Sequence, residues 1–140
     1  MSVDFTATMQ KRGEGKFPGF VGIEVLEVVP KLVRMRLTLR PEHLAPNGFL
    51  HAGVVVTLAD TAAGYGTIAS LPDGGHNFTT IELKSNFFST LREGALACTS
   101  TQLHGGRTTQ VWDSLVTDEA TGKTLASFRC TQLVMYPKPV

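Results

Sequence analysis

The fold is decided by residues 47–70, which read NGFLHAGVVVTLADTAAGYGTIAS. The Ala, Val and Leu content predicts a helix over residues 51–70, after a loop over residues 41–50 that holds two prolines, an asparagine and a glycine. This helix is apolar on nearly all sides instead of along one stripe, a pattern that predicts burial on every side. Its many alanines and glycines would let a sheet or a partner approach closely.

The segments on either side of this helix have the alternating apolar and polar residues of half-buried strands. Two strands are predicted before the helix, with Pro30 and Lys31 as their turn, and four after it. The predicted strands cover residues 20–30, 32–40, 77–88, 94–104, 108–118 and 123–136. A short helix is predicted over residues 3–12, broken by Gly13, Gly15, Pro18 and Gly19. One long buried helix against six antiparallel strands predicts an α+β fold in which the sheet curls around the helix.

The size and charge of the chain limit the classes of function. A length of 140 residues fits one domain, and 13 basic against 12 acidic residues leave a net charge of +1, which disfavours a nucleic-acid-binding arm or a polybasic membrane patch. The longest strongly apolar segment, residues 53–66, contains Asp60 and is shorter than the ~20 residues that span a bilayer. The N-terminal residues lack the apolar core of a signal peptide. We therefore expect a cytoplasmic protein with neither a membrane nor a nucleic acid as partner.

The cysteines and histidines do not have the spacing of a metal site. Cys98 and Cys130 are far apart and form no C-x-x-C pair, so we expect both to be buried, reduced thiols. The four histidines are scattered, and no metal is predicted. The glycine motifs of nucleotide hydrolases and dinucleotide enzymes are also missing.

Asp60 is the acidic residue in the middle of the apolar helix. An unpaired carboxylate in low-dielectric surroundings either destabilises the fold or has a raised pKa. One interpretation is a general base or nucleophile whose basicity is raised by its surroundings. The other is a structural aspartate that is hydrogen-bonded to Thr57, Thr61 or a neighbouring strand, and the residues alone leave both open.

The start of the helix is the second candidate for chemistry. The backbone N–H groups of His51, Ala52 and Gly53 would be among the unsatisfied donors of the first turn, at the positive end of the helix dipole. Such a terminus can polarise a carbonyl oxygen and stabilise an oxyanion. The alternative is an ordinary helix start with His51 near its cap.

These two candidates are too far apart to act together within one chain. His51 and Asp60 are nine positions apart, which corresponds to about 13–14 Å along a helix and to opposite faces. A shared site therefore needs two copies of the protein about a two-fold axis, with the helix start from one copy and the carboxylate from the other. If the protein is an enzyme, the sequence predicts an obligate dimer.

Residues 47–60, with a loop, His51, two small residues and then Leu-Ala-Asp, closely resemble the hotdog-fold acyl-CoA thioesterases, particularly the phenylacetate-degradation type. The later strands agree, with TTIELKSN at residues 79–86, REG at 92–94 and HGGRTTQVW at 104–112. The resemblance spans about residues 20–136. It implies a hotdog domain over residues 20–140 after an N-terminal helical segment and loop over residues 1–19. The implied reaction is hydrolysis of an acyl-CoA to the free acid and CoA, with CoA as part of the substrate and no other cofactor.

The resemblance also implies roles for individual residues. Asp60 is the base that activates water or the nucleophile that attacks the carbonyl, and the amide of Ala52 or Gly53 polarises the thioester oxygen. His51 orients the site, and Thr80 helps to place water or Asp60. The family usually has two glycines after the histidine, and Ala52 replaces the first one, a change that keeps the backbone donor.

A second departure from the family pattern concerns an amide side chain. Many relatives carry Asn or Gln six residues before the histidine, and this position is Ala45. Asn47, four residues before the histidine, substitutes for it if the loop follows a different path. The other interpretation of Asn47 is a turn former in Pro-Asn-Gly.

Relatives hold CoA along strand edges near the subunit boundary, which implies Ser89, Thr90, Gly106 and Arg107 as CoA-binding residues here. Arg107 can pair with a phosphate, and a solvated turn arginine is the alternative. The acyl pocket is expected at the seam of a dimer, with the small residues of 59–64 and Phe49, Phe87 or Phe88 in its walls. The expected assembly is a homodimer at minimum, and a homotetramer as a dimer of dimers.

Two other functions stay open on the same residues. One is a hotdog enoyl-CoA hydratase or dehydratase, in which His51 and Asp60 would form an acid-base pair. The other is a non-catalytic acyl-CoA-binding module that senses metabolites. Asp60 argues against the module, because binding gains nothing from an isolated carboxylate in a buried helix.

Overall fold

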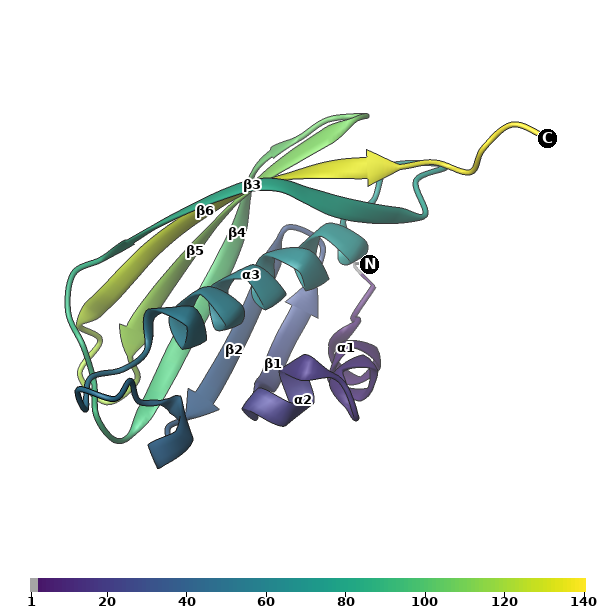
Figure 1. Ribbon diagram of the computed structural model, residues 1–140. Helices are drawn as coiled ribbons and strands as arrows, with labels where there is room; N and C mark the ends of the chain where they lie inside the picture. The colour runs from purple at the N-terminus through teal and green to yellow at the C-terminus, as the bar shows by residue number, and fades with distance from the viewer. Residues whose placement is uncertain (1–2) are drawn as a thin grey trace.

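The computed structural model describes residues 3–140 and confirms the α+β architecture, a long central helix wrapped by a curved antiparallel sheet. The elements in chain order are α1 (Thr6–Gly13), α2 (Phe17–Val21), β1 (Glu24–Val29), β2 (Leu32–Thr38), a single turn of 3-10 helix (Pro41–His43), α3 (Ala52–Ala69), β3 (Asn77–Phe87), β4 (Ala95–Gly105), β5 (Thr109–Asp118) and β6 (Thr124–Met135). The six strands form one sheet in the order β1-β2-β4-β5-β6-β3. Every neighbouring pair is antiparallel. Figure 1 shows α3 lying in the hollow of this sheet.

Small residues and one hydroxyl fix α3 against the sheet. Gly66 lies against the ring of Trp112, which is fully buried, and a Cβ at this position would overlap the ring. The Ser114 hydroxyl of β5 donates a hydrogen bond of 3.0 Å to the carbonyl of Ala59. This bond ties the helix to the sheet at the residue before Asp60, so the position of Asp60 is set by the core.

α3 has 18 residues, and by length and composition it is the one helix of residues 3–140 that could cross a membrane. Half of these residues are buried inside the protein. The helix is thus a core helix of this fold, and burial on every side, which the sequence predicts, is found for half of its residues within one chain.

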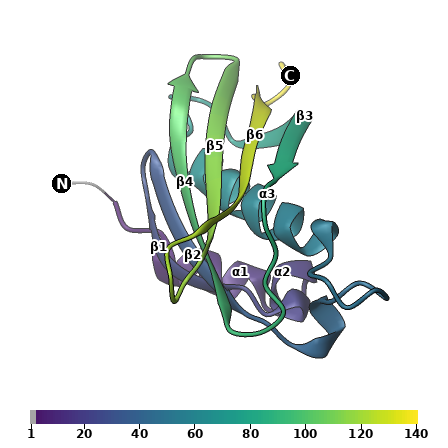
Figure 2. The same cartoon turned by 90° about the vertical axis from the view of Figure 1, so that its left-hand side faces the viewer.

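The two edges of the sheet are covered differently. On the β1 edge, the Thr6 hydroxyl of α1 accepts a 2.9 Å hydrogen bond from the Val28 N–H, and the Gln10 amide oxygen accepts one of 2.7 Å from the Val25 N–H. Figures 1 and 2 show α1 and α2 beside this edge. No described strand pairs with the outer edge of β3, which exposes Ile81 and Leu83. An uncovered apolar edge is the part of a sheet most suited to pairing with a second chain.

The N-terminal region differs from the sequence prediction. The first helix begins at Thr6 and includes Gly13, which the sequence predicts to break it. Pro18 and Gly19 also lie within a helix, α2, because proline is favourable in the first turn, where its missing N–H has no intrahelical acceptor. The first strand consequently begins at Glu24 instead of residue 20.

Other boundaries agree more closely. The turn between the first two strands is confirmed at Pro30 and Lys31, with Lys31 in the left-handed region at φ 72°. His51 and Ser70 are the caps of α3 and not its first and last residues. Cys98 and Cys130 are buried free thiols, as expected, and burial raises the pKa of each to about 12.

Candidate active site

A cavity of about 320 Å³ lies beside Asp60, between α3, the N-terminal helices and the start of β3. Its residues come from three parts of the chain: Asp60, Thr61, Gly64, Tyr65 and Ile68 from α3, Arg12 and Pro18 from the N-terminal helices, and Asn77 and Phe78 from β3. The absence of a side chain at Gly64 lets the Phe78 ring lie against the helix, since a Cβ there would come within 2.9 Å of the ring. The volume is within the range of small-molecule sites.

The Asp60 carboxylate has no partner among residues 3–140. Its Oδ1 atom is buried and makes no hydrogen bond. The Thr57 hydroxyl donates instead to the Gly53 carbonyl at 2.7 Å. Burial raises the pKa of Asp60 above its usual value because the charged form is poorly solvated. The structural interpretation of Asp60 required a hydrogen-bond partner on the helix or a neighbouring strand, and the described residues provide none.

Strand β3 contributes Asn77 and Phe78 to the cavity, and it pairs with strand β6, which carries Cys130 and Gln132. Burial and, secondarily, the negative charge of Asp60 raise the pKa of the Cys130 thiol. Two positions further on β6, the fully buried Gln132 accepts a 2.6 Å hydrogen bond from the Thr80 hydroxyl. The Gln132 Nε2 group has no partner among residues 3–140. The hydroxyl of Thr80, which the resemblance implies as a group that places water or Asp60, is therefore the donor of a hydrogen bond to Gln132. Gln132 has no feature in the sequence that marks it as a site residue.

The start of α3 narrows the choice of oxyanion donor. His51 caps the helix, and its Nδ1 atom accepts a 2.8 Å hydrogen bond from the Gly53 N–H. An accepting Nδ1 leaves the proton of the neutral ring on Nε2. The Gly53 donor is thus occupied, whereas the exposed Ala52 N–H has no hydrogen-bond acceptor within residues 3–140. Ala52 is the free donor at the positive end of the helix.

The structure places Asn47 in a turn. Its side-chain oxygen accepts a 3.2 Å hydrogen bond from the Phe49 N–H, and the Ala45 N–H donates to the Phe49 carbonyl at 2.7 Å. This geometry is that of the turn former in Pro-Asn-Gly. The Asn47 side chain is exposed, at the loop that leads into the start of α3.

The helix start and Asp60 are not brought together in one chain. α3 is continuous from Ala52 to Ala69, so His51 and Asp60 remain about 13–14 Å apart along its axis and on opposite faces, and the Ala52 amide is about 12 Å from Asp60 along the same axis. Within one protomer, the cavity contains the carboxylate and lacks the free amide.

The residues expected to bind CoA form two separate pairs. Thr90 lies beside the loop before α3, where its hydroxyl accepts a 3.2 Å hydrogen bond from the Leu50 N–H, and Ser89 is its neighbour in the chain. Gly106 and Arg107 lie in the hairpin at the other end of β4; Arg107 is exposed, and its carbonyl accepts a hydrogen bond from the Tyr136 hydroxyl. One chain therefore does not gather all four residues around a single ligand.

The phenylalanines expected in the acyl pocket do not line the cavity. Phe49, Phe87 and Phe88 are exposed, and Phe49 packs under the guanidinium of Arg92. The aromatic walls are Tyr65 and Phe78, and α1 supplies Arg12. These residues were missed because their convergence depends on how the N-terminal helices pack on α3, which has no local sequence signal.

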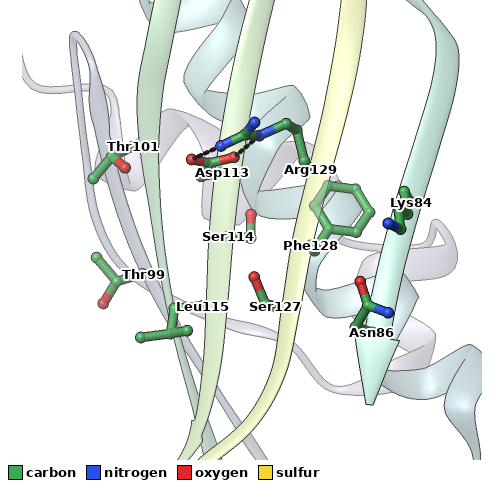
Figure 3. Close-up of a pocket in the computed structure, with 10 residues that line it drawn as sticks. All are labelled: Lys84, Asn86, Thr99, Thr101, Asp113, Ser114, Leu115, Ser127, Phe128 and Arg129. Carbon is green, nitrogen blue, oxygen red and sulfur yellow. Dashed lines mark hydrogen bonds and ion pairs between the residues drawn. The ribbon is translucent and has the colours of Figure 1, made fainter. Parts of the chain in front are cut away.

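A second depression, of about 530 Å³, lies on the opposite face of the sheet (Figure 3). Asp113 and Arg129 form a bidentate ion pair there, with N–O distances of 2.5 and 2.9 Å. Figure 3 shows Lys84 and Asn86 along the neighbouring strand, with no acid unpaired among the ten residues drawn. This depression lacks the desolvated carboxylate of the first cavity.

A family model and a curated relative place this chain in the same family. Residues 47–125 match the model of the thioesterase superfamily. The 1,4-dihydroxy-2-naphthoyl-CoA hydrolase of Listeria monocytogenes is 34% identical over 111 residues, which cover 79% of this chain and 89% of that protein.

Solved structures agree in fold. A thioesterase mutant from Pseudomonas aeruginosa superposes with a TM-score of 0.87 at 22% identity, covering 94% of each chain. The phenylacetic acid degradation protein of Thermus thermophilus, solved as a mutant, is another neighbour, with a TM-score of 0.77 at 22% identity over 85% of this chain and 98% of its own. The phenylacetate-degradation type is thus one neighbour among several.

Proposed function

The chain belongs to the thioesterase superfamily and is an acyl-CoA thioester hydrolase; from this premise we propose that its substrates are aromatic acyl-CoA thioesters. The aromatic walls of the cavity, Tyr65 and Phe78, support this choice. The Listeria relative, by its name, acts on a naphthoyl thioester. In the reaction, water adds its oxygen to the acyl carbon, the carbon–sulfur bond breaks, and the CoA sulfur leaves and takes up a proton.

The observation that carries the hydrolytic chemistry of this proposal is the unpaired, desolvated carboxylate of Asp60 in the cavity wall. A carboxylate with a raised pKa is a stronger base than an exposed one. It either removes a proton from the attacking water or attacks the acyl carbon itself. Both routes need the ionised form of Asp60 at the moment of reaction.

We assign the polarisation of the thioester oxygen to the Ala52 N–H of a second copy. Backbone donors at the positive end of a helix stabilise the negative charge that develops on this oxygen. The donor must come from a second copy because α3 separates Ala52 from Asp60 within one chain. The uncovered apolar edge of β3, with Ile81 and Leu83, is our candidate for the dimer seam. A dimer of dimers is our proposal for the full assembly.

The test of the reaction is release of free thiol from a panel of acyl-CoAs. We expect turnover of benzoyl-CoA, phenylacetyl-CoA and 2-naphthoyl-CoA, with lower kcat/KM for hexanoyl-CoA and octanoyl-CoA. A preference for the straight chains would contradict the aromatic assignment. Addition of water to an enoyl-CoA without thiol release would instead indicate a hydratase, and tight binding with no turnover would indicate a binding module.

The shared site has its own test, the variant Ala52→Pro. Ala52 is the first residue of α3 and follows His51 at ψ 128°, so proline fits this position and removes only the N–H. We expect kcat to fall by about 100-fold or more, the usual effect of losing an oxyanion donor.

Mixing this variant with Asp60→Asn is the decisive step. In a mixed dimer one site has both intact groups and the other has neither, so a refolded equimolar mixture should recover about one quarter of the wild-type activity. Differently tagged subunits, purified through both tags, verify that mixed dimers form. No recovery in verified mixed dimers would show that the two groups do not share a site.

A further inference from the structure

The wall of the cavity is built partly by α1, which lies outside residues 47–125 matched by the family model. Tyr65 and Ile68 follow Asp60 by five and eight positions on α3, which places them about 7 Å and 12 Å along the helix axis from it. An acyl group whose carbonyl lies at Asp60 and whose ring follows the helix therefore reaches Tyr65 and the last turn of α1.

The Tyr65 hydroxyl lies against that last turn. A Cβ placed on Gly13 would be 3.2 Å from this oxygen. Burial raises the pKa of Tyr65, and the nearby positive charge of Arg12 acts in the opposite direction. Arg12 and the Tyr65 hydroxyl are thus close neighbours at one end of the cavity.

Both groups have unused hydrogen-bonding capacity. Within residues 3–140, the Arg12 guanidinium forms no ion pair and the Tyr65 hydroxyl forms no hydrogen bond. The side-chain oxygen of Asn77, a further polar group of the wall, is already occupied by the Phe78 N–H at 2.9 Å. The surrounding wall is apolar, with Pro18, Ile68 and Phe78. Arg12 is exposed and Tyr65 is half-buried. Two free donors beside these apolar side chains are suited to fixing one oxygen atom of a ligand.

We propose that Arg12 and Tyr65 are specificity-determining residues that select aromatic acyl groups with a hydroxyl on the ring edge remote from the thioester. The inference rests on the proposed function, because it places the thioester at Asp60. The Arg12 guanidinium donates a charge-assisted hydrogen bond to the ring oxygen, and the Tyr65 hydroxyl contributes a second bond. A bare ring leaves both donors without an acceptor and gains neither bond.

The experiment compares 6-hydroxy-2-naphthoyl-CoA with 2-naphthoyl-CoA. For the wild-type protein and for Arg12→Met and Tyr65→Phe, two ratios are measured: the ratio of kcat/KM for the two esters, and the ratio of Kd for the matching non-hydrolysable thioether analogues. Lys11→Met is the matched control, since Lys11 is the neighbour of Arg12 on the same helix, is exposed like Arg12, and lies outside the cavity wall.

We expect the wild type to prefer the hydroxylated compound by about tenfold or more in both ratios. Arg12→Met should remove most of this preference and Tyr65→Phe part of it, because the hydroxylated compound loses more than 2-naphthoyl-CoA does, while Lys11→Met changes neither ratio. An unchanged preference in both variants, or an equal loss for both esters, would overturn the proposal. Failure of all esters to turn over would refute the proposed function alone, and the thioether ratio would still decide the role of Arg12 and Tyr65.

Discussion

Asp60 and Asp113 lie on opposite faces of the sheet and differ in what surrounds their carboxylates. Asp60 faces a cavity of about 320 Å³, with a buried oxygen that has no partner and a pKa raised by burial. Asp113 lies in a larger depression of about 530 Å³, where Arg129 holds both of its oxygens (Figure 3). The smaller hollow is the reactive candidate because its charge is uncompensated, whereas the larger one contains a charge that is already neutralised.

The largest expected difference is in activity. Asp60→Asn should lower kcat by about 100-fold or more, because the amide can neither accept a proton from water nor attack the acyl carbon. Asp113→Asn, the same isosteric change on the other face, should leave kcat within about twofold, since surface substitutions away from the site have small effects. Thiol release from an aromatic acyl-CoA, with circular dichroism to verify the fold, measures both. Equal losses in the two variants would remove the distinction between the faces.

The pH dependence of kcat/KM is the next effect in size. Burial raises the pKa of Asp60 above 3.8, and the protonated carboxyl is inactive in either chemical role. Activity should therefore fall by about tenfold per pH unit below the raised pKa, and rise to a plateau above it. The neighbouring Cys130 thiol does not titrate in this range, because its pKa is raised to about 12.

The control for this profile is Asp113→Asn, which should keep the same acidic limb. The measurement is kcat/KM between pH 4 and 9 in buffers of constant ionic strength. A profile that stays flat down to pH 4 would show that no carboxyl with a raised pKa takes part.

The sequence is sufficient to predict most of the fold because strand alternation and the apolar helix are local signals. The predicted strand over residues 77–88 is found at Asn77–Phe87, and the helix over 51–70 at Ala52–Ala69. The N-terminal segment is predicted less well, because Pro18 and Gly19 are typical helix breakers, whereas here a short helix uses Pro18 in its first turn.

The residues of the candidate site also differ in whether a local sequence pattern marks them. Asp60 and the helix start are visible in the sequence, since an acid in an apolar helix and a His-Ala-Gly helix start are local patterns. Arg12 and Gln132 have no such pattern. Arg12 lines the cavity only because α1 packs near α3, and Gln132 meets Thr80 only because β6 pairs with β3, so both positions depend on contacts between distant parts of the chain.

The smallest expected effect is on stability, and its sign again separates the two aspartates. When the pKa of a carboxyl is higher in the folded protein than in the unfolded chain, the folded protein loses stability as the pH rises from the unfolded pKa through the folded pKa. Asp60→Asn should therefore increase the free energy of unfolding at pH 7.5 by on the order of 1 kcal/mol, because the neutral amide removes a poorly solvated charge. This gain should disappear below pH 4, where the protonated carboxyl of Asp60 is as neutral as the amide that replaces it.

Asp113→Asn should have a smaller effect of opposite sign, because it breaks the pair with Arg129. Urea unfolding at the two pH values, at one fixed protein concentration, measures both changes. If Asp60→Asn were destabilising at pH 7.5, the carboxylate would have a stabilising partner, and its assignment as a strained reactive group would be wrong.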